Sequence, residues 1–435
     1  MDVSEYIEID KEEAVQSRTY GFRTVIENPQ YISLWVVGLS STTLRWLETP
    51  AIGIFVYQMT ESAMWVALVG FLRMIPMLIF GPVIGMISDR INRKKILLMG
   101  SIFMIFLYLF LAYLSIVGSL NIWHICVGVF LAGVIWAGDN PVRRALMAEV
   151  VGQKNITIGL GIDMGTSNFG RVIGPIGAGI VIALVGINGS YLTGALMFFF
   201  ATIAIVFISN NNPTFELQKS IGSQKSLSII NTIKSGMSLV AGSQILMATM
   251  IITVIMNLFA FPYQHMVPVI GSEVYRIGPV FIGILLSVEG LGAMLGSLVI
   301  ALKSNHLYNT RIFFFGAIIY VVSIGLFGLL NNYWIILPLM FLGGFGLAGF
   351  STMQTIIILN SSPINKRGSV LGVLSAAIGT GPLGVLQIGL FAAIIGAHFS
   401  VFMSAFVGLV LITSTLLFTR KFLSTEKFTT SVKQK

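Results

Sequence analysis

Two long apolar runs joined by a basic loop make up residues 62–117, SAMWVALVGFLRMIPMLIFGPVIGMISDRINRKKILLMGSIFMIFLYLFLAYLSIV. Each run is long enough for a helix to cross the hydrocarbon core of a bilayer, which takes about 20 apolar residues. The loop between them carries Arg90, Arg93, Lys94 and Lys95. This alternation predicts two membrane-spanning helices, and it is the pattern by which the rest of the chain is interpreted.

The composition supports the same interpretation for the whole chain of 435 residues. Hydrophobic residues make up 55% of it and charged residues only 10%, whereas a soluble domain carries about 25% charged residues. The apolar runs far exceed the ~10-residue alternating strands of an outer-membrane barrel, so helices are the expected spanning element. Twelve runs are expected, at 31–57, 62–88, 95–117, 121–139, 157–186, 191–209, 244–270, 277–302, 310–330, 333–360, 367–397 and 398–418.

The longest interior polar stretch divides the twelve runs into two sets of six, which predicts an all-α membrane protein with two six-helix bundles. The sequence GPIG at 174–177 is echoed by GPLG at 381–384, and such internal repeats are typical of transporters in which one half rocks against the other. Part of the polar stretch, 227–234, is a candidate for a helix on the membrane surface. The predicted units are a tail (1–30), a first bundle (31–209), a cytoplasmic linker (210–243), a second bundle (244–418) and a tail (419–435).

Positive charge is concentrated on one side of this topology. If the amino terminus is cytoplasmic, 22 of the 26 lysines and arginines lie on the cytoplasmic side, and Arg276 lies on the other. Because cytoplasmic loops hold the excess of positive charge, both termini are predicted to be cytoplasmic in a multi-pass protein of the cell membrane. Basic loops beside anionic lipid headgroups also account for the net charge of +9 without a nucleic-acid partner.

The loop after the second run, GMISDRINRKK at 85–95, resembles the G-x-x-x-D-R-x-G-R-[RK] motif of the major facilitator superfamily. In that family the motif locks the two halves together on the cytoplasmic side, and the resemblance implies that Asp89 faces the start of the eleventh run near Gly368. Asn92 replaces the usual glycine, and because asparagine tolerates left-handed backbone we expect the turn to be kept. The alternative is a basic loop that only fixes the topology. The implied gate motif consists of Gly85, Asp89, Arg90, Arg93 and Lys94.

The fifth run contains GRVIGPIGAG at 170–179, which looks like the superfamily's antiporter motif g-x-x-x-G-P-x-x-G-G with Ala178 in place of one glycine. That motif is associated with exporters. Proline removes one backbone donor and the glycines allow helices to cross closely, so we predict a defined bend here. Ordinary helix packing is the alternative. The implied motif residues are Gly170, Gly174, Pro175, Gly177 and Gly179.

Further stretches are similar to the enterobactin-exporter-like and macrolide-efflux-like branch, among them Arg45-Trp46 and residues 140–146, NPVRRAL. The superfamily's fourth-run motif with an interior arginine is absent, and Arg143 and Arg144 lie near the expected cytoplasmic end. The resemblance implies a secondary active transporter that exports small amphipathic organic compounds, such as drugs or siderophores, in exchange for protons.

Charged side chains at bilayer depth are costly and usually functional. Glu289 has no candidate cation in its own half, so we expect it to load and release a proton, as Glu48 does, with arginines tuning both. A static network of ion pairs is the alternative. The candidate residues for proton coupling and the substrate cavity are Arg45, Glu48, Arg73, Asp163, Asn168, Arg171 and Glu289.

The chain lacks the sequence motifs of several other classes of protein. The sequence contains no Gly-Lys pair, which excludes the phosphate-binding loop of an ATP-driven pump, and neither G-x-S-x-G nor H-E-x-x-H occurs. We therefore expect no enzyme activity, cofactor or metal, and a monomer that works with a small-molecule substrate, protons and the lipid bilayer. An uptake symporter and a transport-inactive sensor on the same fold stay open. The three arginines favour an anionic or zwitterionic substrate such as a siderophore, and Glu48 and Glu289 favour a cationic drug.

Overall fold

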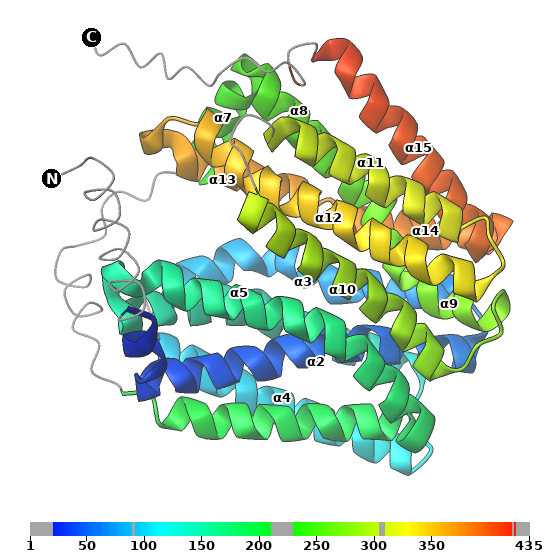
Figure 1. Ribbon diagram of the computed structural model, residues 1–435. Coiled ribbons are helices and arrows are strands. Elements are labelled where there is room, and N and C mark those ends of the chain that lie inside the picture. The colour runs from blue at the N-terminus through cyan, green and yellow to red at the C-terminus, as the bar shows by residue number, and fades with distance from the viewer. Residues whose placement is uncertain (1–20, 89–91, 210–228, 304–308, 420–421, 423–435) are drawn as a thin grey trace, which may run out of the picture.

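The computed structural model describes residues 21–88, 92–209, 229–303, 309–419 and 422, and these residues form helices and turns (Figure 1). The helices are α2 (Pro29–Thr60), α3 (Ala63–Ser88), α4 (Arg93–Ile116), α5 (Ile122–Val206), α7 (Ile229–Gly242), α8 (Gln244–Ile255), η1 (Met256–Ala260), η2 (Phe261–His265), α9 (Val267–Glu273), α10 (Pro279–Lys303), α11 (Asn309–Phe327), α12 (Tyr333–Ser361), η4 (Ile364–Lys366), α13 (Arg367–Ile378), α14 (Gly381–Ile395) and α15 (Ala397–Phe418).

Every predicted apolar run in the described residues is helical. Ten stretches are long and apolar enough to cross a membrane, and one of them, Lys154–Val206, is 53 residues long. A straight helix of that length would measure about 80 Å, more than two crossings. Its backbone turns at Gly186 (φ 70°), and an earlier turn at Gly152 (φ 71°) separates it from the preceding span of α5. With Pro29–Thr60, an apolar helix of 32 residues, the twelve expected spans are accounted for, and the all-α membrane fold is confirmed.

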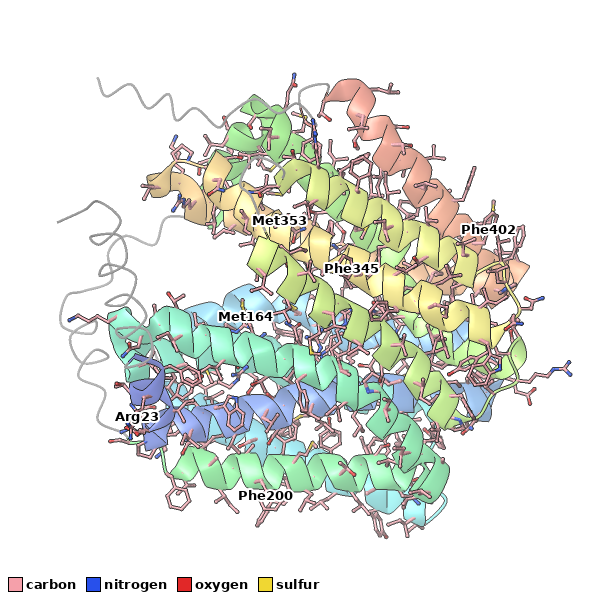
Figure 2. The ribbon with its side chains drawn as sticks, viewed as in Figure 1. Arg23, Met164, Phe200, Phe345, Met353 and Phe402 are labelled. Atoms are coloured by element: carbon pink, nitrogen blue, oxygen red, sulfur yellow. The ribbon has the colours of Figure 1, made fainter. Side chains whose placement is uncertain are left out.

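The helices form two groups (Figure 1). Helices α2 to α5 lie together at the bottom of the view, and α8 to α15 lie together above them. Large apolar side chains are exposed around the outside of both groups. Figure 2 labels one of them, Phe200, where it points away from the molecule. Such exposure is what a protein surrounded by lipid requires.

The predicted surface helix at 227–234 lies partly outside the described residues. From Ile229 the chain is helical as far as Gly242, which is longer than expected. This helix, α7, packs on α13, where Ser235 Oγ donates a hydrogen bond to Ser369 Oγ (3.2 Å).

The two groups touch from the middle of the molecule to one end. We call this the closed end; it holds the turn between α2 and α3. Here a Cβ on Gly283 of α10 would overlap the carbonyl oxygen of Pro175 of α5. The Tyr57 hydroxyl of α2 donates a hydrogen bond to Glu273 of α9 (2.5 Å). Close contact between helices of different halves therefore seals this end.

The opposite end, which holds the turn between α3 and α4, is open between the described helices. A Cβ on Gly161 of α5 or on Gly372 of α13 would meet no atom within 4 Å. Met164, which Figure 2 labels on the side of α5 facing the other group, is 56% exposed, and Leu302 of α10 is 77% exposed. The contact between α5 and α10 therefore ends midway along both helices, and we call this the open end.

Glycine decides how closely α10 and α12 cross, which gives a first prediction. A methyl group at Gly344 of α12 would overlap the carbonyl oxygen of Glu289, so Gly344→Ala should destabilise the protein by about 1–3 kcal/mol, as overpacking does. The measurement is the midpoint of thermal unfolding in detergent. Gly372→Ala is the matched control, because it adds the same methyl to a helix in open space and should leave the midpoint unchanged. Equal effects of the two variants would contradict the packing argument.

Candidate transport site

Glu48 of α2 is a buried carboxylate whose partners come from the other helices of the first half. It is 3% exposed. It accepts hydrogen bonds from Arg73 Nη1 of α3 (2.6 Å) and from the Tyr108 hydroxyl of α4 (2.9 Å). The charge of Glu48 is therefore balanced within its own half.

Glu289 of α10 is a second buried carboxylate, and its counter-ion comes from the other half. It is 2% exposed. Arg171 Nη2 of α5 donates a hydrogen bond to it at 2.8 Å. The hydroxyls of Tyr263 and Tyr320 (3.3 Å) and the amide of Gln264 (3.3 Å) donate as well. The side chains of both halves thus meet at one carboxylate.

The prediction that Glu289 lacks a fixed cation is wrong for this conformation. Among the described residues of its own half, Glu289 has no cationic partner, as expected; its cation comes from the other half. Arg171 is 118 residues away in sequence and reaches Glu289 because α5 packs directly on α10 at the closed end. A charge that is isolated within one bundle is paired once the two bundles are in contact.

A break in the seventh span brings Tyr263 and Gln264 to Glu289. Helix α8 continues into a π-helical turn, Met256–Ala260, and then into a 3₁₀ turn, Phe261–His265. Pro262 cannot donate a backbone hydrogen bond, which favours an interruption of the α-helix at this point. Such π turns are frequent at functional sites, and here the interruption places two adjacent side chains on the same carboxylate.

Arg45 of α2 lies in the same region but has a different kind of partner. Its guanidinium carbon is 3.6 Å from the ring centre of Trp136 in α5 and 5.8 Å from that of Trp46. Within the described residues it forms no ion pair. Arg45 and Glu48 lie three residues apart in α2 and so share one face of the helix, but Glu48 pairs with Arg73.

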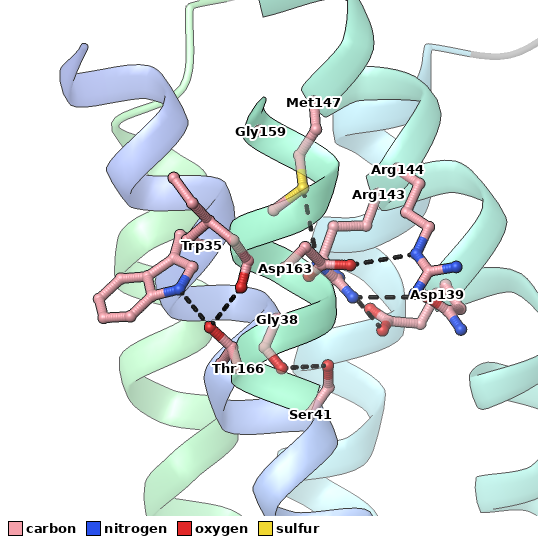
Figure 3. A network of polar contacts seen from close by, with 12 residues as sticks. Trp35, Gly38, Ser41, Asp139, Arg143, Arg144, Met147, Gly159, Asp163 and Thr166 are labelled. Atoms are coloured by element: carbon pink, nitrogen blue, oxygen red, sulfur yellow. Dashed lines mark hydrogen bonds and ion pairs between the residues drawn. The ribbon is translucent and has the colours of Figure 1, made fainter. Parts of the chain in front are cut away.

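Asp163 belongs to a separate cluster nearer the open end (Figure 3). It accepts hydrogen bonds from Arg143 and from Arg144 Nε (3.1 Å). Arg143 also donates to Asn140 (3.4 Å) and lies 3.9 Å from Asp139. The fourth run was expected to end at residue 139, before Arg143, but α5 continues helically past Arg143 to Gly152, and the residue is 2% exposed.

Small residues of α2 make room for this cluster. A Cβ on Gly38 would overlap the guanidinium of Arg143, so only glycine allows the arginine to lie against α2. Close by, Trp35 Nε1 donates a hydrogen bond to Thr166 Oγ1 (2.7 Å), and Ser41 Oγ donates to the Gly38 carbonyl (3.4 Å) (Figure 3). The bond between Trp35 and Thr166 and the contact of Arg143 with Gly38 fix α2 against α5, whereas the bond of Ser41 lies within α2.

The two gate-motif residues with described contacts bind within the first half. Arg93 of α4 forms an ion pair with Glu149 of α5. Lys94 Nζ donates hydrogen bonds to the carbonyls of Val206 (3.0 Å) and Ile208, which end α5. These residues therefore join the start of α4 to α5 at Glu149, just before the turn at Gly152, and at the end of the helix.

Asn92 adopts a different backbone conformation from the one predicted. Its φ is −57°, so the backbone is not left-handed, and its side chain caps α4 by accepting a hydrogen bond from Lys94 N (2.9 Å). Asparagine is a favoured residue at this capping position. Gly85 lies in α3; Asp89 and Arg90 fall outside the described residues, and the gating role stays a prediction.

The glycines at the start of the antiporter motif pack α5 on α2. A Cβ on Gly170 would lie 3.4 Å from Thr43 Cα, and one on Gly174 would lie 2.8 Å from the Trp46 carbonyl carbon. At Gly177 the nearest atom would be Leu47 Cδ1 at 3.6 Å. This part of the motif therefore provides close packing within the first half.

The rest of the motif faces α10 of the second half. A Cβ on Gly179 would overlap the carbonyl oxygen of Pro279. The backbone N–H of Ile176, next to Pro175, donates a hydrogen bond to Ser287 Oγ (3.1 Å). The non-helical angles within α5 occur at Gly152 and Gly186, and the bend at Pro175 stays a prediction. This part of the motif is a surface on which the two halves meet.

Two cavities border these groups. The first, about 20 Å³, lies between the halves and is lined in part by Thr49, Gly53, Arg73, Gln264, His265 and Pro268. The second, also about 20 Å³, lies within the first half and is lined in part by Ser41, Arg45, Glu48, Arg73, Trp136 and Asp139. Arg73 borders both cavities. Asn168 is exposed on α5, one turn from Arg171 toward the open end.

Several residues of the site were not selected from the sequence. The tyrosines and the glutamine carry no charge, and polar aromatic residues are common in membrane helices. The one feature of the sequence that could have identified them is their position within predicted spans, where an unpaired hydroxyl or amide is costly. The missed residues are Tyr108, Trp136, Arg143, Tyr263, Gln264 and Tyr320.

A membrane bundle of two helical halves, in contact at one end and joined at mid-depth by the buried ion pair between Arg171 and Glu289, defines a transporter of the major facilitator class. The comparison with known families identifies the family within this class. The profile described as "Transmembrane secretion effector" matches residues 24–433, and the chain belongs to this family of major facilitator transporters. Members of the family are transporters rather than enzymes.

Similar proteins include a macrolide efflux protein and a staphyloferrin A transporter. Macrolide efflux protein A of Streptococcus pyogenes is 22% identical over 85% of this chain and 91% of its own length. The staphyloferrin A transporter of Staphylococcus aureus is 22% identical over 81% of this chain and 87% of its own.

Solved structures share the fold. A POT family transporter in complex with a thioalcohol-conjugated peptide matches with a TM-score of 0.69 and 13% identity, over 90% of this chain and 96% of that one. A bacterial homologue of the iron transporter ferroportin matches with a TM-score of 0.64 and 14% identity, over 91% and 98%.

The pair between Arg73 and Glu48 gives a second prediction. Arg73→Gln should destabilise the protein by about 3–5 kcal/mol, because it leaves a buried carboxylate without its counter-ion. The double variant Glu48→Gln/Arg73→Gln should recover much of that loss, since no charge is then left unpaired. Thermal unfolding of both variants in detergent measures this. Losses that simply add in the double variant would show that the two groups are not coupled.

Proposed function

We propose that this protein exports small amphipathic organic compounds across the cell membrane in exchange for protons. The observation that carries the proposal is the ion pair between Arg171 of the first half and Glu289 of the second, 2.8 Å apart. The named activities of similar proteins, macrolide efflux among them, support export. The open end supports a pathway that alternates between the two sides of the membrane.

The proposed orientation has the open end in the cytoplasm. The helix ends, connecting segments and tails on that side of the topology carry 22 of the 26 lysines and arginines, and the excess of positive charge marks the cytoplasmic face. The conformation described above would then be the one that accepts a substrate from the cytoplasm, with both termini on that side.

The pair between the halves links protonation to the shape of the protein. Opening the closed end must separate Arg171 from Glu289, since the residues lie on different halves. A carboxylate left alone at this depth is costly, so in the outward-open state Glu289 takes up a proton from outside. A neutral Glu289 cannot form the ion pair. When the halves close again, the proton leaves toward the cytoplasm and the pair re-forms.

Substrate binding supplies the other half of the exchange. A molecule that enters from the open end and binds beside Arg171 competes with Glu289 for the guanidinium. Competition weakens the pair that holds the closed end together and favours the outward-open state. One site can then be occupied alternately by substrate and proton, which is the requirement for antiport.

A third prediction tests coupling at Glu289. In inside-out vesicles containing a pH dye, macrolides, cationic drugs and siderophores are screened for compounds that induce proton release by the wild-type protein. Glu289→Gln should abolish that release, because glutamine cannot carry the proton. Glu27→Gln is the matched control; this carboxylate is exposed and pairs with Arg23, four residues away on the surface, so its loss should leave release unchanged.

Two results would contradict the proposal. Full proton release by Glu289→Gln would remove Glu289 from coupling. Proton-linked uptake of a compound into right-side-out vesicles, with no export of any compound, would mean that the protein is an uptake symporter. Binding of compounds without any flux would indicate a sensor on a transporter fold.

A fourth prediction tests the orientation. The sequence contains one cysteine, Cys126, which is buried, so Cys126→Ala gives a background without thiols. Gly372→Cys in that background should react with a membrane-impermeant maleimide in inside-out vesicles and be protected in intact cells. The reverse pattern of labelling would place the open end outside the cell.

A further inference from the structure

We propose that the substrate carries a carboxylate and that Arg45, stacked on Trp136, is the residue that binds it. This inference names the substrate class of the transport site and rests on the proposed function. It chooses between the two substrate classes that the sequence left open. The observations that carry it are the pairing of charges at mid-depth and the geometry of Arg45.

The central charges do not cancel. Glu48 is paired with Arg73 at 2.6 Å, and Glu289 is paired with Arg171 at 2.8 Å. Arg45 is the third arginine of this region and has no carboxylate partner among the described residues. With both glutamates ionised, the centre therefore holds one positive charge in excess.

The cluster nearer the open end does not supply the missing negative charge. Asp139 and Asp163 face Arg143 and Arg144, so two acids meet two bases. Asp163 is bound by both arginines, and Asp139 is 3.9 Å from Arg143. The excess charge of the described mid-depth groups therefore stays at Arg45.

An unpaired charge at bilayer depth is expensive and is usually retained for function. The guanidinium of Arg45 lies over the ring of Trp136 at 3.6 Å and lines a cavity that Ser41 and Asp139 also border. Stacking on an aromatic ring uses the face of the guanidinium and leaves the N–H donors at its edge for a ligand. A carboxylate fits those donors with two parallel hydrogen bonds. The excess positive charge repels a cationic drug.

Arg45 is also placed to connect the substrate with the gate. Trp46 lies near both arginines, with its ring centre 5.8 Å from the Arg45 carbon and 5.0 Å from that of Arg171. A carboxylate bound at Arg45 therefore sits near the arginine that pairs with Glu289. Its negative charge can replace that of Glu289 beside Arg171, which is the competition that antiport requires.

The test compares matched pairs of compounds that differ in the carboxylate. The probes are carboxyfluorescein and its dimethyl ester, in which both carboxyl groups are blocked, with ethidium as a cation, and binding to the purified full-length protein is followed by fluorescence anisotropy. Wild type should bind carboxyfluorescein at least about tenfold more tightly than the ester, as loss of one charged hydrogen-bonding group predicts. Ethidium should bind weakly.

Variants of Arg45 test whether this residue is responsible for the preference for the acid. Arg45→Gln should abolish the preference for the acid over the ester, and Arg45→Lys should keep part of it, because lysine retains the charge but not the planar stacking. Arg276→Gln, which removes an arginine of the turn at the closed end, is the matched control and should bind like wild type. Each variant's unfolding midpoint is measured, so that a folding defect is recognised; Arg45→Lys keeps the test decisive if Arg45→Gln does not fold.

The outcomes separate this inference from the proposed function. Proton release driven by ethidium and not by carboxyfluorescein would overturn the carboxylate site and leave antiport standing. Binding of carboxyfluorescein that depends on Arg45, without proton release by any compound, would support the site and reject antiport. Equal binding of acid and ester, binding of neither, or an unchanged preference in Arg45→Gln would overturn the inference.

Discussion

The ion pair between Arg171 and Glu289 is the interaction on which the arrangement of this protein depends. Each charge lies at a depth where solvation is poor, so neither is stable alone. They lie on different halves, and the pair exists only while α5 and α10 are in contact. The electrostatics of two side chains are thereby tied to the relative position of two six-helix groups, and any change of partner changes the shape.

Small residues make that pair geometrically feasible. Gly283 lies against Pro175, and a Cβ on Gly290 would come within 2.8 Å of the Arg171 carbonyl oxygen. In lipid there is little hydrophobic drive for helices to associate, so close packing through glycine holds them together. The tyrosines around Glu289 satisfy the remaining acceptor sites of the carboxylate. The charge and its surroundings therefore form one unit that includes residues of both halves.

Much of the fold could be predicted from the sequence, and much of the site could not. The twelve spans follow from composition because a helix in lipid must be apolar over a fixed length. The candidate charges could be selected for the same reason, since each interrupts an apolar run. Their partners could not be assigned: Glu289 was expected to lack a cation, and no spacing in the sequence paired Glu48 with Arg73. Pairing depends on which helices are neighbours, and the spacing of apolar residues does not contain that information.

The sequence by itself determined that the chain spans the membrane, which side of it is basic, and which residues carry charge into the hydrocarbon. These properties are local, because each depends on a window of about 20 residues and the cost of burying a polar group there. Only the tertiary structure decided that Arg171 reaches Glu289, that the halves meet at one end, and that Arg45 stacks on Trp136 without an acid. These properties are non-local: they depend on helix crossings set by glycines far apart in the chain.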